Sequence, residues 1–273
     1  MSDTKIFAIS NHKGGVGKTT TAVNLSTALV KENKKVLLID IDPQAHATSL
    51  VQDKIVPKVY IPELFNNYIL DIAMPETDEY IYTNDEGVSF IASNASLSTV
   101  LISLVPATCR EFALKSILEP IKQQYDYILI DCSPSFDLLT LNAFNVANGI
   151  LVPVQSNDDF AIDGLDELIK NVDMVKRRTN PDINIEGIIL TKFINSTIIS
   201  KLVYETIESY TPNIRVYNSK ISFATKVAET PRARKSIFAH CPKAKAAKEY
   251  ENLAKEVIKY GIGETSRIKV SQK

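Results

Sequence analysis

Two lysines, Lys13 and Lys18, enclose three glycines in the stretch NHKGGVGKTTT at residues 11–21. The common phosphate-binding loop reads G-x-x-x-x-G-K-[ST], and its first glycine would fall at position 12, where this chain has His12. The stretch therefore departs from the common pattern at one position and adds a lysine ahead of a Gly-Gly pair. Because glycines let backbone N–H groups turn inward and a helix N-terminus adds partial positive charge, we expect this loop to hold a polyphosphate.

The residues after the glycines suggest specific roles. Lys18 is expected to reach the β- and γ-phosphates, and the Thr19 hydroxyl is expected to bind Mg²⁺. The remaining predicted nucleotide contacts are Gly14, Gly15, Val16, Gly17 and Thr20. A glycine-rich turn without a ligand is the alternative, but the strand, the G-K-T-T run and the helix are all in register for a phosphate loop.

Three aspartates stand at predicted strand ends. Asp40 and Asp42 lie two apart in VLLIDIDPQ, so on an extended chain both point towards the ligand edge of the sheet. One can hold a metal-bound water and the other can orient an attacking water. Asp131 ends the apolar run YDYILID and is expected to bind Mg²⁺ through water. A single strand-terminal aspartate often only caps the next helix, but three of them beside a phosphate loop favour a metal and water site.

The elements that must position these residues alternate along the chain. Apolar runs predict strands at 5–10, 35–40, 88–93, 126–131, 149–154 and 183–191. Helical periodicity predicts helices at about 18–32, 108–123, 137–148, 160–178, 197–209 and 244–260. Nearly continuous apolar strands are buried on both faces. We therefore predict an α/β fold, a doubly wound and mostly parallel sheet flanked by helices, with its ligand beyond the carboxyl ends of the strands.

Composition sets broad limits on the class of protein. The 273 residues include 31 basic and 32 acidic ones, so the total charge gives no hint of a partner. Three widely spaced cysteines, Cys109, Cys132 and Cys241, indicate reduced thiols in a cytoplasmic protein rather than a disulfide frame or a zinc site. No apolar run approaches the ~18 residues that would span a bilayer. We expect one domain over 1–260 and a C-terminal tail at 261–273, and the role of 51–87 stays open.

The quoted motifs carry a family resemblance. KGGVGKTT, VLLIDIDPQ, YDYILIDCSPS and ILVPVQSNDDFAIDGLDEL resemble the ParA/Soj branch of the ParA/MinD family, the deviant Walker A ATPases of DNA segregation. The resemblance continues to VAETPRARKSIFAHCPKAKAAKEYENLAKEV and so covers nearly the whole chain. It implies a P-loop NTPase-like fold, ATP and Mg²⁺ as cofactors, and hydrolysis of ATP to ADP and phosphate that is weak without a partner.

The resemblance also implies residue roles. Lys13 matches the signature lysine, which in this family reaches across a homodimer interface to the phosphates of the other subunit, so that two ATPs are sandwiched. Lys13 is thus both a nucleotide contact and, with Lys18, a catalytic residue. Asp42 is expected to orient the attacking water and Asp40 to support metal hydration. His12 stands where the family often has glutamine, and we expect it to be solvated.

Other stretches of the sequence indicate which nucleobase and which partners the protein binds. Guanine-binding relatives use [NT]-K-x-D, whereas Thr191-Lys192-Phe193-Ile194 lacks the carboxylate, which favours adenine; the resemblance places Pro231 near that base. Between residues 215 and 248 the sequence has nine basic residues and a single acid, Glu229. The basic residues form a candidate surface for nonspecific DNA: Arg215, Lys220, Lys226, Arg232, Arg234, Lys235, Lys243, Lys245 and Lys248. A charge run alone is more often a solubilising surface, but the resemblance implies DNA binding here, a nucleoid-associated cytoplasmic location and a ParB-like centromere-binding partner.

Three rival classes remain. A membrane-positioning relative of the MinD type would end in an amphipathic helix that faces lipid, whereas we read 244–260 as docked on the domain and expect no membrane contact. An iron–sulfur relative would use Cys109 and Cys132, but neither has glycine-rich surroundings. A repressor would need a helix-turn-helix domain ahead of the loop, for which ten residues leave no room.

Overall fold

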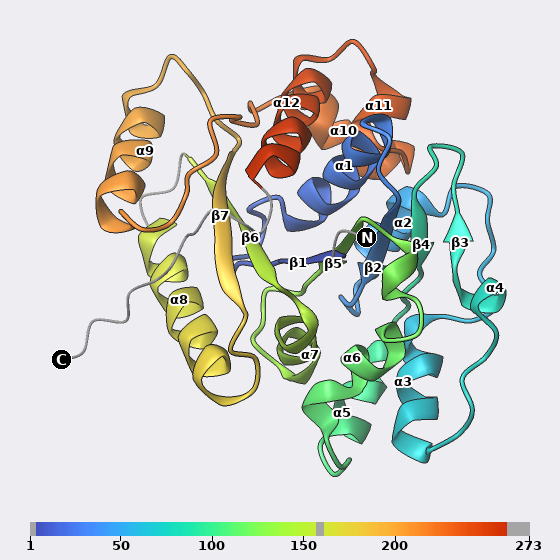
Figure 1. Ribbon diagram of the computed structural model, residues 1–273. Helices are drawn as coiled ribbons and strands as arrows, with labels where there is room; N and C mark the ends of the chain where they lie inside the picture. Colours follow the sequence, from blue (N-terminus) through green and yellow to red (C-terminus); the bar gives the residue numbers. More distant parts are fainter. Residues whose placement is uncertain (1–3, 157–160, 261–273) are drawn as a thin grey trace.

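The computed structural model describes residues 4–156 and 161–260 (Figure 1). Its strands are β1 (Lys5–Ile9), β2 (Val36–Asp40), β3 (Tyr82–Thr83), β4 (Ser89–Ile91), β5 (Tyr127–Asp131), β6 (Gly149–Gln155) and β7 (Asn184–Thr191). Its α-helices are α1 (Lys18–Lys31), α2 (His46–Val51), α3 (Ile61–Leu70), α4 (Thr77–Tyr80), α5 (Leu97–Leu104), α6 (Ala113–Leu118), α7 (Leu138–Val146), α8 (Ala161–Arg178), α9 (Ile198–Tyr210), α10 (Thr225–Ala233), α11 (Ile237–His240) and α12 (Lys245–Tyr260). Two short 3₁₀ helices, at Arg110–Phe112 and Lys122–Gln124, flank α6.

The described strands form one sheet in the order β3-β4-β2-β5-β1-β6-β7. Neighbouring strands are parallel throughout, except that the two-residue β3 runs antiparallel to β4 at the edge. This confirms the predicted doubly wound, mostly parallel α/β fold. The order places β1, which leads into the glycine loop, between β5 and β6 near the middle of the sheet.

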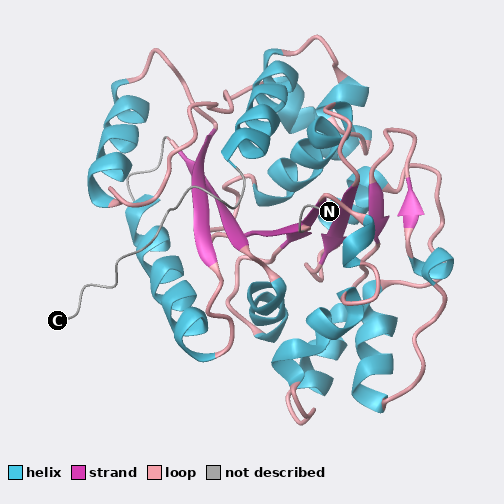
Figure 2. Ribbon diagram, viewed as in Figure 1, coloured by secondary structure: helices cyan, strands magenta, loops and turns pink. Residues whose placement is uncertain are grey.

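Side chains alternate between two apolar cores, one on each face of the sheet. On β1, Ile6 and Ala8 join the core beneath α3 and α5–α9, while Phe7 and Ile9 join the core beneath α1, α2, α11 and α12. Figures 1 and 2 show the sheet between these two helical layers. This period of two, with both faces covered, explains why the strands read as continuous apolar runs.

Each of the six predicted strands agrees with the structure to within two residues at both ends, whereas one predicted helix is shorter than expected. The segment 108–123 divides into a 3₁₀ turn, the six-residue α6 and a second 3₁₀ turn. Pro120 lies between α6 and that second turn; because proline has no N–H for a helical hydrogen bond, the helix does not continue through it. The helix predicted at 244–260 docks on α1 through Tyr250, Leu253 and Val257, as expected.

The segment 51–87, which had no predicted structure, holds α3, α4 and β3. At the start of α3, the Glu63 side chain accepts a hydrogen bond from the backbone N–H of Tyr60 and so satisfies one of the free donors at the helix start. Leu64 and Phe65 of α3 are fully buried, so this segment contributes to the core. The predicted tail 261–273 lies outside the described residues, and the single domain over 1–260 stays a prediction.

Candidate nucleotide-binding site

The glycine loop joins β1 to α1 at the carboxyl edge of the sheet. Gly17 forms the N-cap of α1 with φ 92°, and Gly15 has φ 74°. Both are left-handed conformations that glycine adopts without the strain a side chain would bring. The helix begins at Lys18, as the sequence predicted. The first N–H groups of α1 therefore face the loop, which is the arrangement that binds anions.

Neighbouring strands fix the loop backbone on two sides. The Thr191 hydroxyl, at the end of β7, donates to the carbonyl oxygens of Val16 at 2.7 Å and Val154 at 3.2 Å. On the other side, Asn11 donates from Nδ2 to the Pro153 carbonyl and accepts the Lys13 N–H at its Oδ1. The conformation of the loop thus depends on β6 and β7.

Lys18 is buried at the base of the loop. Its Nζ donates to the carbonyl oxygens of Asn11 at 3.1 Å and Lys13 at 3.0 Å. Burial lowers the pKa of Lys18, while the nearby carboxylates of Asp131 and Asp42 act in the opposite direction. The ammonium group lies where loop carbonyls and carboxylates converge, and a phosphate in the loop would give it a stronger anionic partner.

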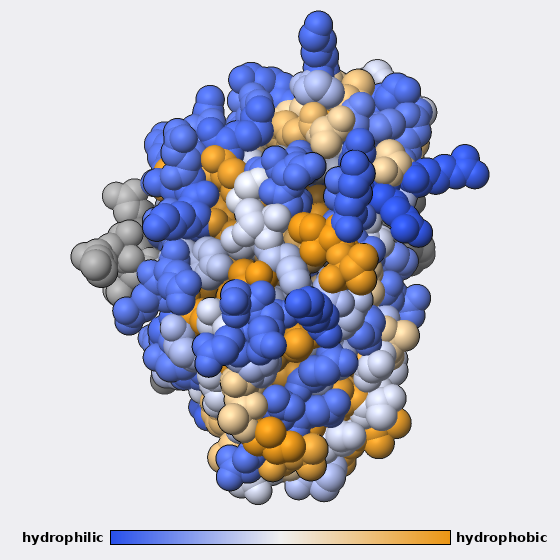
Figure 3. All heavy atoms as spheres, turned by 90° about the vertical axis from the view of Figure 1, so that its right-hand side faces the viewer, coloured by the Kyte–Doolittle hydropathy of each residue, from blue (hydrophilic) through white to orange (hydrophobic). Residues whose placement is uncertain are grey.

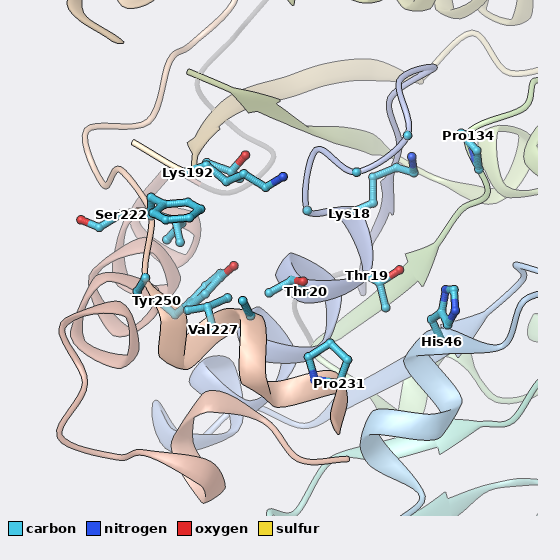
Figure 4. A pocket seen from close by; sticks show the side chains of 18 of the residues that line it. Lys18, Thr19, Thr20, His46, Pro134, Lys192, Ser222, Val227, Pro231 and Tyr250 are labelled. Atoms are coloured by element: carbon cyan, nitrogen blue, oxygen red, sulfur yellow. The ribbon is translucent and has the colours of Figure 1, made fainter. Parts of the chain in front are cut away.

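One pocket, with a volume of about 490 Å³, opens at this edge. It is lined by Gly14, Gly15, Gly17, Lys18, Thr19, Thr20, Asp42, Gln44, His46, Pro134, Thr191, Lys192, Ile221, Ser222, Phe223, Ala224, Val227, Ala228, Pro231 and Tyr250. Figure 4 shows Lys18 and Thr19 on the side towards Pro134 and His46, with Val227 on the opposite side. Most predicted loop contacts and Pro231 thus share one cavity, whereas Lys13 and Val16 do not line it.

Asp40, the last residue of β2, and Asp42, two residues further on, have different environments. Asp40 is buried beneath the pocket, and its carboxylate accepts three hydrogen bonds, from the Asp42 N–H, the Thr48 N–H and the Thr48 hydroxyl. Burial raises the pKa of Asp40 to about 6, although these hydrogen bonds act in the opposite direction. Asp42 lines the pocket. The expectation that both side chains point towards the ligand is therefore met by Asp42 alone.

Asp131 ends β5 directly beside Asp40 on β2. Both of its carboxylate oxygens are buried, and neither accepts a hydrogen bond from the protein. Burial, followed by the charge of Asp40, raises the pKa of Asp131 well above its ordinary value, and the Thr19 hydroxyl lies near enough to lower it in part. A buried carboxylate without a partner is costly unless a cation or a proton satisfies it.

These groups fit a Mg²⁺ site that needs a nucleotide to complete it. Within the described residues, no three His, Cys, Asp or Glu side chains converge as a metal cage. Mg²⁺ usually takes one or two protein oxygens, several waters and substrate phosphates, so a full cage is not required. Thr19, which lines the pocket, and the unpartnered Asp131 supply oxygens of the right kind.

The wall opposite the loop comes from the C-terminal third of the chain. α10 contributes Val227 and Pro231, and α12 contributes Tyr250, whose hydroxyl lies 3.5 Å from the Thr21 hydroxyl of α1. The sequence predicted Pro231 but missed Phe223, whose ring is exposed at the pocket. Isolated apolar residues in an irregular stretch carry no signal of a ligand wall until the fold places them opposite the loop.

His12 is less exposed than expected. Its side chain is 14% exposed and packs against α8. One ring nitrogen lies 2.8 Å from the Asn171 amide, the other lies 3.9 Å from the Glu167 carboxylate, and the ring also contacts Phe136. The expectation of a solvated histidine is therefore wrong, because α8 packs beside the loop and encloses the ring.

The nine basic residues of the candidate DNA-binding surface have unequal surroundings. Arg215 pairs with Glu186 at 3.0 Å and stacks on the Tyr260 ring. Lys220 is only half-exposed, and its ammonium lies 3.9 Å from the centre of the Tyr204 ring. Three others are exposed but paired with acids: Lys226 with Glu229, Lys245 with Glu249, and Lys248 with Glu251.

The remaining four basic side chains are exposed, and the described part of the chain provides no ion-pair partner for them. They are Arg232, Arg234, Lys235 and Lys243. Arg234 is the C-cap of α10 in a left-handed conformation with φ 48°. Glycine adopts this conformation more readily than a residue with a side chain, so Arg234 departs from the usual residue of a left-handed helix C-cap. Of the nine basic residues, those without an acidic partner therefore lie between α10 and the start of α12.

The rival classes gain little support from the structure. Cys109 is exposed at the surface while Cys132 is buried, so the two thiols do not share an environment. In the part of the chain that the structure describes, no helix is both long and apolar enough to cross a membrane. α12 buries its apolar face against α1.

Comparison with known proteins identifies the class. A family model described as an AAA domain matches residues 4–185. Sporulation initiation inhibitor protein Soj of Bacillus subtilis is 39% identical, over 94% of this chain and 99% of that protein. Chromosome partitioning protein ParA of Myxococcus xanthus is 35% identical, over 98% of this chain and 92% of that protein.

Solved structures agree with this relationship. A putative plasmid partition protein of Borrelia burgdorferi B31 bound to AMPPNP has a TM-score of 0.74 and 27% identity, over 94% of this chain and 99% of that one. A cobyrinic acid a,c-diamide synthase of Mycobacterium smegmatis with bound ADP and magnesium has a TM-score of 0.79 and 28% identity, over 94% and 95%. The fold and the loop define a P-loop NTPase-type protein. The chain belongs to the ParA/Soj family of partition proteins.

Proposed function

We propose that this protein is a partition ATPase that binds ATP and Mg²⁺ and hydrolyses ATP to ADP and phosphate. The observation that carries this proposal is that Lys18, Thr19 and Asp42 line one pocket. These residues supply a phosphate-binding cation, a hydroxyl for the metal and a carboxylate open to water. Relatives solved with AMPPNP, and with ADP and magnesium, support the choice of ligand.

Each side chain has a distinct task in this proposal. The N–H groups of the loop and of α1 bind the β-phosphate, and Lys18 exchanges its carbonyl partners for phosphate oxygens. Asp42 holds and orients the attacking water from the pocket wall. Thr19 and Asp131 would hold Mg²⁺, and Asp40 would support its hydration. When bound, Mg²⁺ neutralises charge on the phosphates.

The second lysine requires a second subunit. Lys13 does not line the pocket of its own chain, although its backbone holds both Asn11 and Lys18 in place. We propose that its side chain reaches the phosphates of a partner protomer, so that ATP closes a sandwich homodimer. An additional cation at the phosphates offsets the negative charge that develops during phosphoryl transfer.

The closed dimer is proposed to bind nonspecific DNA through the four basic side chains around α10 and α11 that have no acidic partner. It would therefore be nucleoid-associated in the cytoplasm. A ParB-like centromere-binding protein would stimulate hydrolysis and release the dimer, so that a plasmid or chromosome is segregated. Because the contacts are electrostatic, binding should fall steeply with salt and show little sequence preference.

The decisive experiment measures binding to random-sequence duplex DNA and, in parallel, to anionic liposomes. Each surface is tested without nucleotide, with ADP and with AMPPNP. Binding to DNA that needs AMPPNP and is lost in Lys18→Ala and Arg234→Glu supports the proposal. Binding to liposomes but not to DNA would replace it with a membrane-positioning function.

A further inference from the structure

The pocket wall opposite the phosphate loop includes a segment that runs beside β7, residues 215–223, which we call the wall segment. Ile221, Ser222 and Phe223 of this segment line the pocket. Backbone hydrogen bonds hold the edge of the segment that faces β7; for example, the Phe223 N–H donates to the Phe193 carbonyl at 3.1 Å. The other backbone N–H groups of the segment need partners from elsewhere, because a buried donor without an acceptor is costly.

Two glutamates of α12 supply these partners. The Glu249 carboxylate accepts the Ser222 N–H at 2.8 Å and the Ser222 hydroxyl at 2.5 Å. The Glu256 carboxylate accepts the N–H groups of Asn218 at 2.9 Å and Ser219 at 2.7 Å. Seven residues make nearly two turns of helix, so both carboxylates lie on one face of α12. They bind the wall segment along the edge that a further strand would otherwise cover.

The same helix also holds the phosphate side of the pocket. On its apolar face, Tyr250, Leu253 and Val257 join the core that contains α1. α1 begins directly at the phosphate loop. α12 therefore contacts both the helix that follows the loop and the segment that forms the opposite wall. Its position sets the separation between these two sides of the pocket.

Lys245 belongs to this arrangement. It begins α12 at the upper end of Figure 1, and Figure 3 shows many hydrophilic side chains at that end of the molecule. An exposed lysine there would ordinarily be a solvated charge. The Lys245 ammonium instead donates to the Ser222 hydroxyl at 3.0 Å and lies 3.3 Å from the Glu249 carboxylate. The lysine thus helps to hold the wall segment.

From these contacts we propose that Glu249 is a positioning residue for the nucleobase of ATP, and that Glu256 and Lys245 assist it. The inference rests on the proposed function, because it assigns the wall segment to the base. Figure 4 shows the Ser222 hydroxyl on the side away from Lys18 and Thr20, so Glu249 acts on the wall from behind. An ionised carboxylate suits this task, since hydrogen bonds to a charged acceptor are stronger than those between neutral groups.

Glu249→Gln in the full-length protein is the central test. The substitution keeps the size of the side chain but replaces one acceptor oxygen with an amide group that cannot accept. We expect the affinity for AMPPNP to fall about tenfold. The affinity for inorganic tripolyphosphate, which has no base, should stay within about twofold, because Thr191 and Asn11 hold the phosphate loop independently. Displacement of a fluorescent AMPPNP derivative measures both ligands.

Kinetics provide a second reading that a loss of folded protein would not produce. If Glu249 only positions the base, Glu249→Gln should raise the KM for ATP and retain the kcat at saturating ATP. Ser222→Ala removes the hydroxyl but keeps the N–H, so its effect should be smaller. In the double variant the two effects should not add, because both substitutions break the same contact.

Other positions on α12 grade the effect. Glu256→Gln should weaken AMPPNP binding less than Glu249→Gln, because its partners lie outside the pocket lining. Lys245→Ala should also weaken it by a few-fold. The matched controls are Glu251→Gln and Lys255→Ala, whose ion pairs involve no part of the wall segment, and both should bind AMPPNP like the native chain. Circular dichroism confirms that each variant folds.

Two results would overturn the inference. Equal loss of AMPPNP and tripolyphosphate affinity in Glu249→Gln would mean that the glutamate supports the fold as a whole. An unchanged AMPPNP affinity in that variant, or an equal loss in the two controls, would show that the wall does not depend on this contact. Failure of the native chain to bind AMPPNP at all would instead refute the proposed function itself.

Discussion

Asp40 and Asp131 end two adjacent parallel strands side by side, yet only Asp40 accepts hydrogen bonds from the protein. The two buried carboxylates therefore differ in how the protein satisfies them. Asp40 joins β2 to α2 through Thr48, whereas Asp131 keeps two oxygens for a ligand. Their substitutions should separate structural from metal-binding roles.

Asp40→Ala should lower the free energy of unfolding by about 2–4 kcal/mol, because it leaves three buried donors without an acceptor. Asp131→Asn should leave that free energy unchanged or raise it slightly, because it removes an unpartnered buried carboxylate. It should also abolish the dependence of ADP affinity on Mg²⁺. Urea unfolding and nucleotide titrations with and without Mg²⁺ check both effects. Equal destabilisation by the two substitutions would contradict the assignment.

The two loop lysines should fail in different ways. Lys18→Ala should lose nucleotide binding, since Lys18 lines the pocket. Lys13→Ala keeps the backbone hydrogen bonds to Asn11 and from Lys18, so it should bind ATP as a monomer but lose ATP-dependent dimerisation and about 100-fold in hydrolysis rate. Sedimentation and phosphate release measure these properties.

A mixture of these variants tests whether Lys13 acts across the dimer. The Lys18→Ala chain still carries Lys13, so it can serve ATP bound to a Lys13→Ala chain. Partial recovery of hydrolysis in the mixture is expected. Hydrolysis that stays at the level of the separate variants, in mixed dimers shown to form, would argue against action in trans.

Charge reversal should sort the basic residues by their partners. Arg232→Glu, Arg234→Glu or Lys243→Glu should weaken binding to random-sequence DNA and flatten its dependence on salt. Lys226→Ala and Lys248→Ala should have little effect on DNA binding, because Glu229 and Glu251 already neutralise these lysines. Titrations at several salt concentrations provide the comparison. The assignment fails if the paired lysines matter as much as the unpaired arginines.

Glu86 predicts a pH dependence of stability. Burial raises its pKa, while the hydrogen bond from the Ser236 hydroxyl and the charge of Lys31 lower it in part. A carboxyl with a raised pKa in the folded state favours the protonated form, so its contribution to stability falls as pH rises above the ordinary glutamate value. The free energy of unfolding of Glu86→Gln, measured relative to the native chain, should therefore rise as the pH increases from about 4.5 towards neutral. A constant difference across this range would rule out this cause.

The Thr191 hydroxyl should matter for both the fold and the ligand. Thr191→Val removes the hydrogen bonds to Val16 and Val154 at nearly constant volume, which should cost about 1–2 kcal/mol and weaken AMPPNP binding. Thr191→Ser keeps the hydroxyl and should behave like the native chain. Chemical unfolding and calorimetric titration test the pair. Equal effects of valine and serine would point to lost packing instead.

The sequence predicted the parts of this molecule that local patterns determine. Strands buried on both faces read as apolar runs, and spacing alone placed the glycines and Lys18 at the loop and Asp131 at a strand end. α3 and α5 were missed because they are short and lie in a stretch without clear periodicity. The burial of His12, the anchoring of Asp40 by Thr48 and the wall formed by Phe223 depend on contacts between distant segments, which no local pattern records.

The pocket also has a consequence for synthesis of the chain. Its loop is made within the first twenty residues, whereas Pro231 and Tyr250 come from the last sixth of the chain. The Tyr250 hydroxyl lies 3.5 Å from the Thr21 hydroxyl of α1, so segments far apart in the sequence meet at the pocket. The residues of the phosphate loop are therefore synthesised well before those that complete the opposite wall of the pocket. A fragment without the region after α9 would keep the phosphate loop but lack the pocket wall formed by Pro231 and Tyr250.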